Sequence, residues 1–168
     1  TKVADPVTGS ARYQARVTQG AKEVPGYTLV LGTTNPQTID IVAEEGNTAV
    51  NNVKIFYYVE DTVDIKYEVV GPDGCGTLDN YQNNTVKVVD GTPEGSTPTA
   101  SAGFKFVGWY KDKDCTQPVD EAWIENNRIT PQKTADLGNG TMGYEAATYY
   151  AKFEYDVADL TINKQGWQ

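Results

Sequence analysis

Two blocks of alternating aromatic residues constrain the fold of this chain more than any other feature. The first, FKFVGWY, occupies residues 104–110, and the second, ATYYAKFE, occupies residues 147–154. Successive side chains of a β-strand point to opposite faces, so each block places large rings on one face of a sheet. Burying such rings contributes about 1.5–3 kcal/mol each, and small modules depend on them for stability. The blocks therefore predict two strands of one small β-module.

Turn and strand residues prevail elsewhere, with 16 glycines, 8 prolines and 11 tyrosines among 168 residues. No stretch keeps an apolar period of 3.6 residues, so little helix is expected beyond one short turn carrying Trp123 within residues 118–126. We predict a mostly-β chain.

The chain divides near Asp61. Strands are predicted at residues 52–60 and 63–70, and only Asp61 and Thr62 separate them. Such a short connection indicates a stiff joint between two modules, residues 1–61 and residues 62–156.

Three further strands are predicted in the first module, at residues 11–18, 27–31 and 37–43. In the second module, another strand is predicted at residues 85–89. The last part, residues 157–168, has strand chemistry at 159–164 but no partner after it, so it is interpreted as the first strand of a third domain.

The charge of the chain excludes several functions. Its formal net charge is −9, which disfavours phosphate backbones and anionic lipid surfaces. No apolar run approaches the ~20 residues of a membrane span. There is no histidine, hence no common general base or neutral metal ligand. We expect no enzyme activity, no cofactor, no nucleic-acid partner and no membrane insertion.

Cys75 and Cys115 are the only cysteines. An even number of cysteines in an extracellular chain permits a disulfide, and both lie in turns beside strands of one module. The alternative is a pair of free thiols, and both alternatives stay open at the level of sequence.

Carboxylates near residue 112 offer oxygen ligands for Ca²⁺. They are Asp112, Asp114, Asp120, Glu121 and Glu125. Their spacing does not match an EF-hand loop, which needs ligands at alternate positions and a terminal Glu. Solvated turn residues are the expected interpretation, with no metal site.

The first aromatic block is interpreted as core rather than as a sugar-stacking platform. Strict alternation places Phe104, Phe106 and Tyr110 on one face, with Val107 and Trp109 opposite. A bulge at Gly108 would bring Trp109 round to the phenylalanine side.

The second tyrosine of Tyr57-Tyr58 and of Tyr149-Tyr150 must face away from the first. One of each pair should therefore be partly exposed. The candidate ligand-contact aromatics are Tyr58, Tyr110 and Tyr150.

Residues of about 62–155 resemble the internalin-type B repeats of Gram-positive surface proteins. The resemblance rests on FKFVGWY at 104–110 followed by YAKF at 150–153. It implies a small β-grasp-like sheet, and hence two small tandem β-sheet modules that occur in series within adhesins.

The part before Glu60 resembles a mucin-binding-protein (MucBP) type repeat, through PGYTLV at 25–30, Thr38-Ile39 and IFYY at 55–58. The usual first strand of such a repeat has no clear copy here. Residues 159–168 resemble the opening of a pilin-type (CnaB-like) domain. That resemblance makes Lys164 the lysine of an isopeptide bond in the next domain.

These resemblances imply a non-enzymatic stalk of a cell-wall-attached, extracellular Gram-positive adhesin. Its expected partners are neighbouring repeats of the same chain and host glycoprotein or mucin glycans. The alternative is a carbohydrate-binding accessory module of a secreted glycoside hydrolase. An exposed row of Tyr or Trp would favour that alternative.

Overall fold

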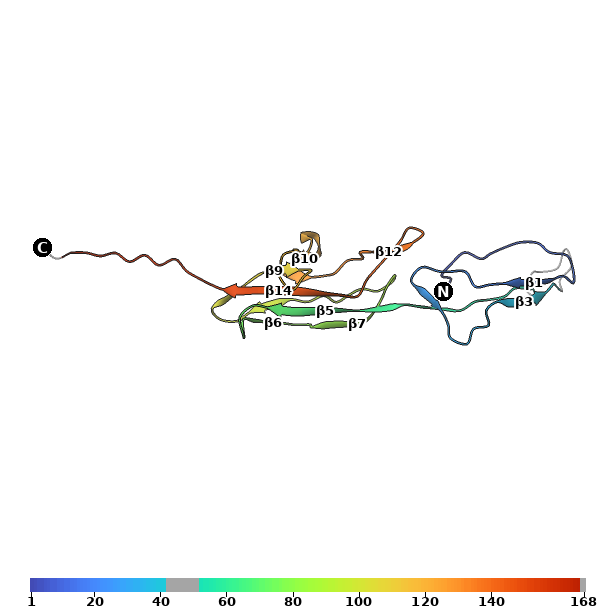
Figure 1. The fold of residues 1–168 in the computed structure, drawn as a ribbon, viewed down its shortest axis with the longest axis horizontal. Coiled ribbons are helices and arrows are strands. Elements are labelled where there is room, and N and C mark those ends of the chain that lie inside the picture. The colour runs from blue at the N-terminus through green and yellow to red at the C-terminus, as the bar shows by residue number, and fades with distance from the viewer. Residues whose placement is uncertain (42–51, 167–168) are drawn as a thin grey trace.

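The computed structural model describes residues 1–41 and 52–166, and it shows an elongated, mostly-β molecule (Figure 1). Two modules lie end to end, and a C-terminal tail leaves the second module at the end far from the first. The described helical structure includes one 3₁₀ turn, η2 at Glu121–Trp123, in the place predicted for a short turn carrying Trp123. The prediction of a mostly-β fold is confirmed.

The N-terminal module contains two separate two-stranded antiparallel sheets. One pairs β1 (Arg16–Gln19) with β3 (Gln37–Asp40), and the other pairs β2 (Tyr27–Leu29) with β4 (Tyr58–Glu60). Val24 is the only buried residue among the described residues of this module. Strand pairing rather than a packed core therefore defines its structure.

The strand predicted at residues 52–60 is shorter in the structure, where only β4 is in strand conformation. β1 and β2 also differ by a few residues from the strands predicted at 11–18 and 27–31. The predicted strand at 37–43 is found as β3, and its residues 42 and 43 lie outside the described residues. Residues 53–57 are not in strand conformation, although the Tyr57 carbonyl accepts a hydrogen bond from the N–H of Val30 (2.8 Å).

A four-stranded sheet forms the second module, with the strand order β7-β5-β14-β9. The strands are β5 (Thr62–Val70), β7 (Gln82–Lys87), β9 (Phe104–Tyr110) and β14 (Ala147–Tyr155). β14 lies centrally, parallel to β5 and antiparallel to β9. Both predicted aromatic blocks are therefore adjacent strands of one sheet.

The second module also contains three small two-stranded sheets. They pair β6 (Gly76–Leu78) with β8 (Pro98–Ala100), β10 (Ile124–Glu125) with β11 (Arg128–Ile129), and β12 (Ala135–Gly138) with β13 (Thr141–Gly143).

The core of the second module lies on one face of the four-stranded sheet. Its largest fully buried side chains include Tyr67 of β5, Trp109 of β9 and Phe153 of β14. Ile129 of β11 and Val119 close the core from the other side. The opposite face of the sheet, called the outer face below, carries the alternate side chains of the same strands.

A bulge in β9 decides which rings enter this core. Lys152 lies opposite Gly108 while the next residue, Phe153, lies opposite Phe106, so β9 holds one extra residue at this point. The bulge turns Trp109 to the phenylalanine side, where only 1% of its surface is exposed and its ring centroid lies 6.1 Å from that of Phe106. The predicted bulge and the core assignment of Trp109 are confirmed.

The same bulge corrects the expectation for Tyr110. Strict alternation placed it on the face of Phe104 and Phe106, but in the structure it is the Cα partner of Tyr150. Tyr150 stands between the buried residues Tyr149 and Ala151 and therefore faces the other way. Tyr110 consequently belongs to the outer face.

The joint between the modules is a single residue, Asp61, which follows β4 and precedes β5. Its N–H donates to the Gly26 carbonyl (2.9 Å), and its carbonyl accepts from the Val88 N–H (3.0 Å). The Glu60 carboxylate accepts hydrogen bonds from the N–H groups of Val89 (2.8 Å) and Asp90 (2.7 Å). Main-chain groups on both sides of the joint are therefore tied together.

The C-terminal tail leaves the sheet after Asp156, whose N–H donates to the Gly103 carbonyl (2.9 Å). Residues 157–166 are exposed and are not in strand conformation. Residues 159–164 lie beside no other strand within the described part of the chain (Figure 1), and their interpretation as the first strand of a following domain stays a prediction.

Candidate functional site

The outer face of the second module brings together two of the three candidate contact tyrosines. Tyr110 of β9 and Tyr150 of β14 are cross-strand partners, and both are half-buried. The Lys152 ammonium lies 5.9 Å from the centroid of the Tyr110 ring, within the range of a cation–π contact. Glu68 of β5 is the partner of Tyr150 on its other side. The result is a tyrosine pair bordered by one cation and one carboxylate.

Gly108 gives the Tyr110 ring its place on this face. A Cβ built at Gly108 would lie 3.7 Å from Cε2 of Tyr110, so the ring covers the glycine. An ion pair between Lys105 and Glu154, 3.2 Å apart, continues the outer face toward the tail. Rings and charged groups of this kind can contact a polar ligand, and they supply no activated nucleophile.

Tyr58, the third candidate, lies elsewhere. Its hydroxyl donates to the Lys22 carbonyl (2.5 Å), and it lines a cleft of about 550 Å³ between the two modules. Tyr27 and Leu29 of the N-terminal module line this cleft, together with Leu137 of the second module. The structure therefore separates Tyr58 from the pair on the outer face.

Sequence reasoning did not find this cleft. The sequence feature that marks the cleft is the glycine at position 26. Its φ of +79° is a conformation that glycine adopts easily and other residues do not. A Cβ at Gly26 would stand 2.6 Å from Cγ2 of Val89, so a side chain here would push the two modules apart.

The cysteines are free thiols, so the structure holds no disulfide between Cys75 and Cys115. Cys75 is buried, and its sulfur would lie 2.9 Å from a Cβ built at Gly71. Cys115 is half-buried in the turn after β9, where burial raises the pKa of its thiol above the ordinary value. The two side chains belong to different environments, a packed core and a surface turn.

The carboxylates near residue 112 organise turns. Asp112 accepts hydrogen bonds from the hydroxyl of Thr116 (2.6 Å) and the N–H of Gln117 (2.8 Å). The bond from the Thr116 hydroxyl is the main cause that lowers the pKa of Asp112. Asp120 caps η2 by accepting from the N–H of Ala122 (2.9 Å). No group of three or more His, Cys, Asp or Glu side chains placed to hold a metal occurs in the described residues.

Lys164 lies in the exposed tail. Its assignment as an isopeptide lysine stays a prediction from resemblance.

Within residues 1–41 and 52–166, no helix has the length and apolar character that a membrane crossing requires. Comparisons with family models, with curated proteins and with solved structures found no significant match. The class that the fold defines is a mostly-β chain of several small sheets. The function of this chain is therefore inferred from the geometry of its own residues.

Proposed function

We propose that this chain is a non-enzymatic spacer from the stalk of an extracellular, cell-wall-attached bacterial adhesin. The observation that carries the proposal is the one-residue joint at Asp61. Two modules joined by a single residue, with hydrogen bonds on both sides of it, hold a fixed extended arrangement better than modules on a flexible linker. Repeated stiff modules extend a binding part away from a surface.

The hydrogen bonds at the joint act in different directions. Asp61 binds Gly26 of the first module and Val88 of the second through its own main chain. The Thr28 hydroxyl also donates to the Asp61 carboxylate (2.6 Å), which fixes the side chain as well. Bending the joint would break several of these bonds at once, and this supports a spacer that resists bending.

Solution scattering tests the spacer function. A rigid end-to-end pair should give a radius of gyration well above the roughly 16 Å of one compact domain of this length. A compact particle, or a scattering curve that requires an ensemble of bent shapes, would contradict the proposal.

Contact with host glycans is a second candidate function, favoured by the pair Tyr110 and Tyr150 on the outer face. Aromatic rings provide apolar surface for the carbon faces of sugars, while Lys152 and Glu68 can bind hydroxyl groups. The alternative, an accessory module of a glycoside hydrolase, relies on the same surface.

A glycan array on the whole chain tests this second function. Binding that is lost in Tyr150→Ala but kept in Tyr81→Ala, an exposed tyrosine in the bend before β7, would assign the contact to the outer face. Binding that survives Tyr110→Ala and Tyr150→Ala together would contradict it.

A further inference from the structure

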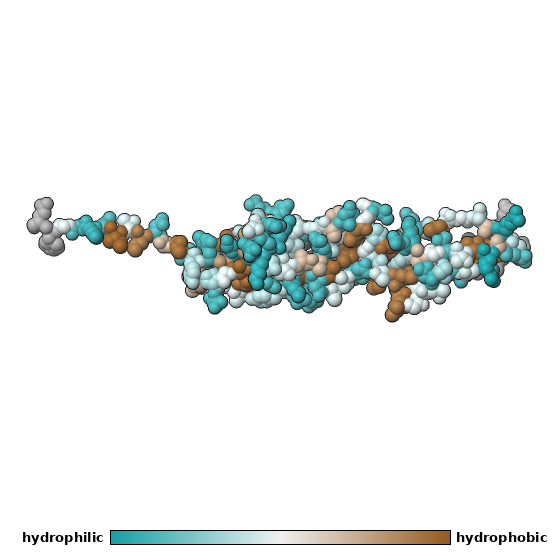
Figure 2. All heavy atoms as spheres, in the orientation of Figure 1, coloured by the Kyte–Doolittle hydropathy of each residue, from teal (hydrophilic) through white to brown (hydrophobic). Residues whose placement is uncertain are grey.

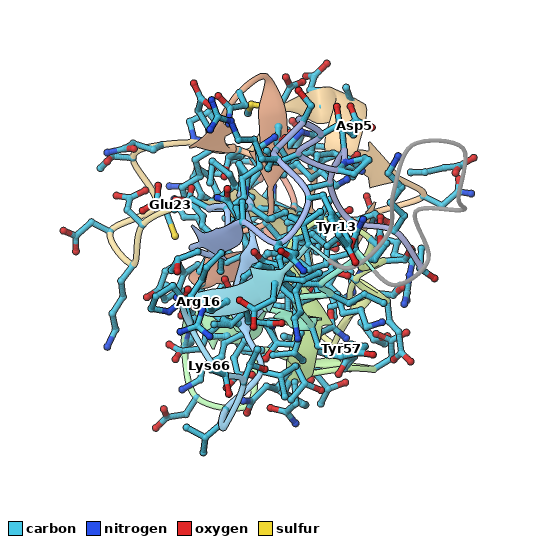
Figure 3. All side chains as sticks on the ribbon, turned by 90° about the vertical axis from the view of Figure 1, so that its right-hand side faces the viewer. Asp5, Tyr13, Arg16, Glu23, Tyr57 and Lys66 are labelled. Carbon is cyan, nitrogen blue, oxygen red and sulfur yellow. The ribbon has the colours of Figure 1, made fainter. Side chains whose placement is uncertain are left out.

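The N-terminal module exposes a row of apolar side chains along residues 55–59, which lead into β4. Ile55, Tyr57 and Val59 have exposed fractions of 57%, 62% and 56%, while Phe56 and Tyr58 between them are half-buried. Figure 2 shows apolar side chains over this module and along the tail, and Figure 3 labels Tyr57 in a view from the module's end. Alternate exposed apolar residues are typical of a strand with one uncovered face.

Within the part of the chain that the structure describes, the edge of β4 that faces away from β2 has no paired strand and is open. The main-chain groups of Tyr57 and Asp61 point toward β2. The Tyr57 carbonyl accepts a hydrogen bond from the N–H of Val30, and the Asp61 N–H donates to the carbonyl of Gly26. Main-chain groups alternate in direction along a strand, so those of Tyr58 point away from β2. Within the described residues β4 pairs with β2 alone. An open edge beside an apolar row is a template for strand addition.

The C-terminal tail has the matching chemistry. Leu160 and Ile162 alternate with Thr161 and Asn163, and their exposed fractions are 82% and 73%. The tail leaves the second module at the end opposite to the N-terminal module (Figure 1). It therefore extends away from the open edge of its own chain, and an edge within reach belongs to a second copy.

We propose that residues 159–164 of one copy add as a parallel strand to another copy, along the open edge of β4 and the segment 54–57 that precedes it. The two segments have the same direction, since in Figure 1 the chain runs from β4 toward the second module and the tail continues that way. When copies follow one another in the same orientation, the tail of one copy therefore runs parallel to β4 of the next copy.

Charge sets the register. Placing Leu160 beside Ile55 and Ile162 beside Tyr57 puts Asp159 beside Lys54, a pair of opposite charges. The same register brings Lys164 next to Val59, adjacent to Glu60. Neighbouring strands lie about 4.8 Å apart, so both apolar pairs would be in contact.

This contact is heterologous, because the edge of one copy meets the tail of the next. Such a contact leaves one free edge and one free tail at the two ends of every assembly, so chains of copies grow rather than closed dimers. The inference goes beyond the spacer function and does not depend on it.

Sedimentation velocity of the whole chain over a concentration series tests the association. We expect species larger than a dimer to appear as concentration rises. Leu160→Asp should weaken association at least about tenfold, because the free energy gained by burying a leucine side chain corresponds to at least that factor in the association constant. Met142→Asp, a matched change at an exposed site on β13, should leave it unchanged. A chain that stays monomeric at its solubility limit would overturn the proposal.

Charge reversal and cross-linking test the register. Lys54→Asp should weaken association about two- to fivefold, and adding Asp159→Lys in the same chain should restore it. In a Cys115→Ser background, a Lys54→Cys chain mixed with an Asp159→Cys chain should form an intermolecular disulfide under mild oxidation. Association without that disulfide would overturn the parallel pairing. Substitutions in the tail should not disturb folding, because the tail is exposed and packs against no other part of the described chain.

Discussion

The indole N–H of Trp109 donates a 2.8 Å hydrogen bond to the main-chain carbonyl of Asn127. The ring is buried between Phe106 and Tyr67, whose ring centroid lies 6.0 Å away. Trp109 thus connects the central sheet to the turn between β10 and β11. A ring that is almost fully buried in the core of the second module therefore also positions a loop.

Replacing Trp109 should therefore destabilise the second module in two distinguishable steps. Trp109→Phe keeps most of the buried surface but leaves the Asn127 carbonyl without its donor, and we expect a loss of about 1–3 kcal/mol. Trp109→Ala adds a cavity and should cost about 3–5 kcal/mol. Urea unfolding followed by circular dichroism measures both. A Trp109→Ala chain of normal stability that had lost glycan binding would contradict the core assignment.

The joint should loosen when the Glu60 carboxylate is removed. Glu60→Ala deprives the N–H groups of Val89 and Asp90 of their acceptor, so the two modules should sample bent arrangements. Glu60→Gln is the matched control because its amide oxygen can still accept both bonds. Solution scattering should show a broader distribution of sizes for the alanine variant alone. Equal scattering of the two variants would mean that Asp61 and Gly26 are sufficient.

The two thiols should react in different states of the chain. In the folded protein only Cys115 should be labelled by a thiol reagent, and Cys75 should react after unfolding in urea. The thiolate is the reactive form, and the raised pKa of Cys115 should make labelling at neutral pH slower than that of an unperturbed thiol, with a rise at alkaline pH. Finding no reactive thiol in urea without a reductant would show a disulfide instead.

Acid should weaken the second module through Asp79. The N–H of Thr97 (2.7 Å) and then the guanidinium of Arg128 (2.8 Å) hold the pKa of this carboxyl below its ordinary value. In the unfolded chain the group titrates near 3.9, so its contribution is present above that pH and is lost as pH falls through the lower folded pKa.

Asp79→Asn tests this directly. The asparagine cannot change charge, so the stability difference between the wild-type chain and the variant should be largest near pH 6 and shrink toward about pH 2. Urea midpoints at both pH values measure it. A difference that stays constant with pH would show that Asp79 acts through hydrogen bonding alone.

Local pattern predicted the long strands of the second module. The aromatic blocks became β9 and β14, and the alternating segment 63–70 became β5, because large and β-branched residues that alternate need a covered sheet face. Gly108 marked the bulge since a strand glycine often permits one. Pattern made the strand that ends at Glu60 too long, because residues 53–57 have strand chemistry but are not in strand conformation.

The sequence by itself determined the β class, the strand at 63–70 and the burial of Trp109, because each follows from residue types within a few positions of one another. Tertiary structure alone decided that Tyr110 stands beside Tyr150, that Tyr58 lines a cleft between modules, and that β14 runs parallel to β5. These depend on which strands become neighbours and on one extra residue in β9. Strand neighbours are chosen by packing across the whole module, which no local pattern encodes.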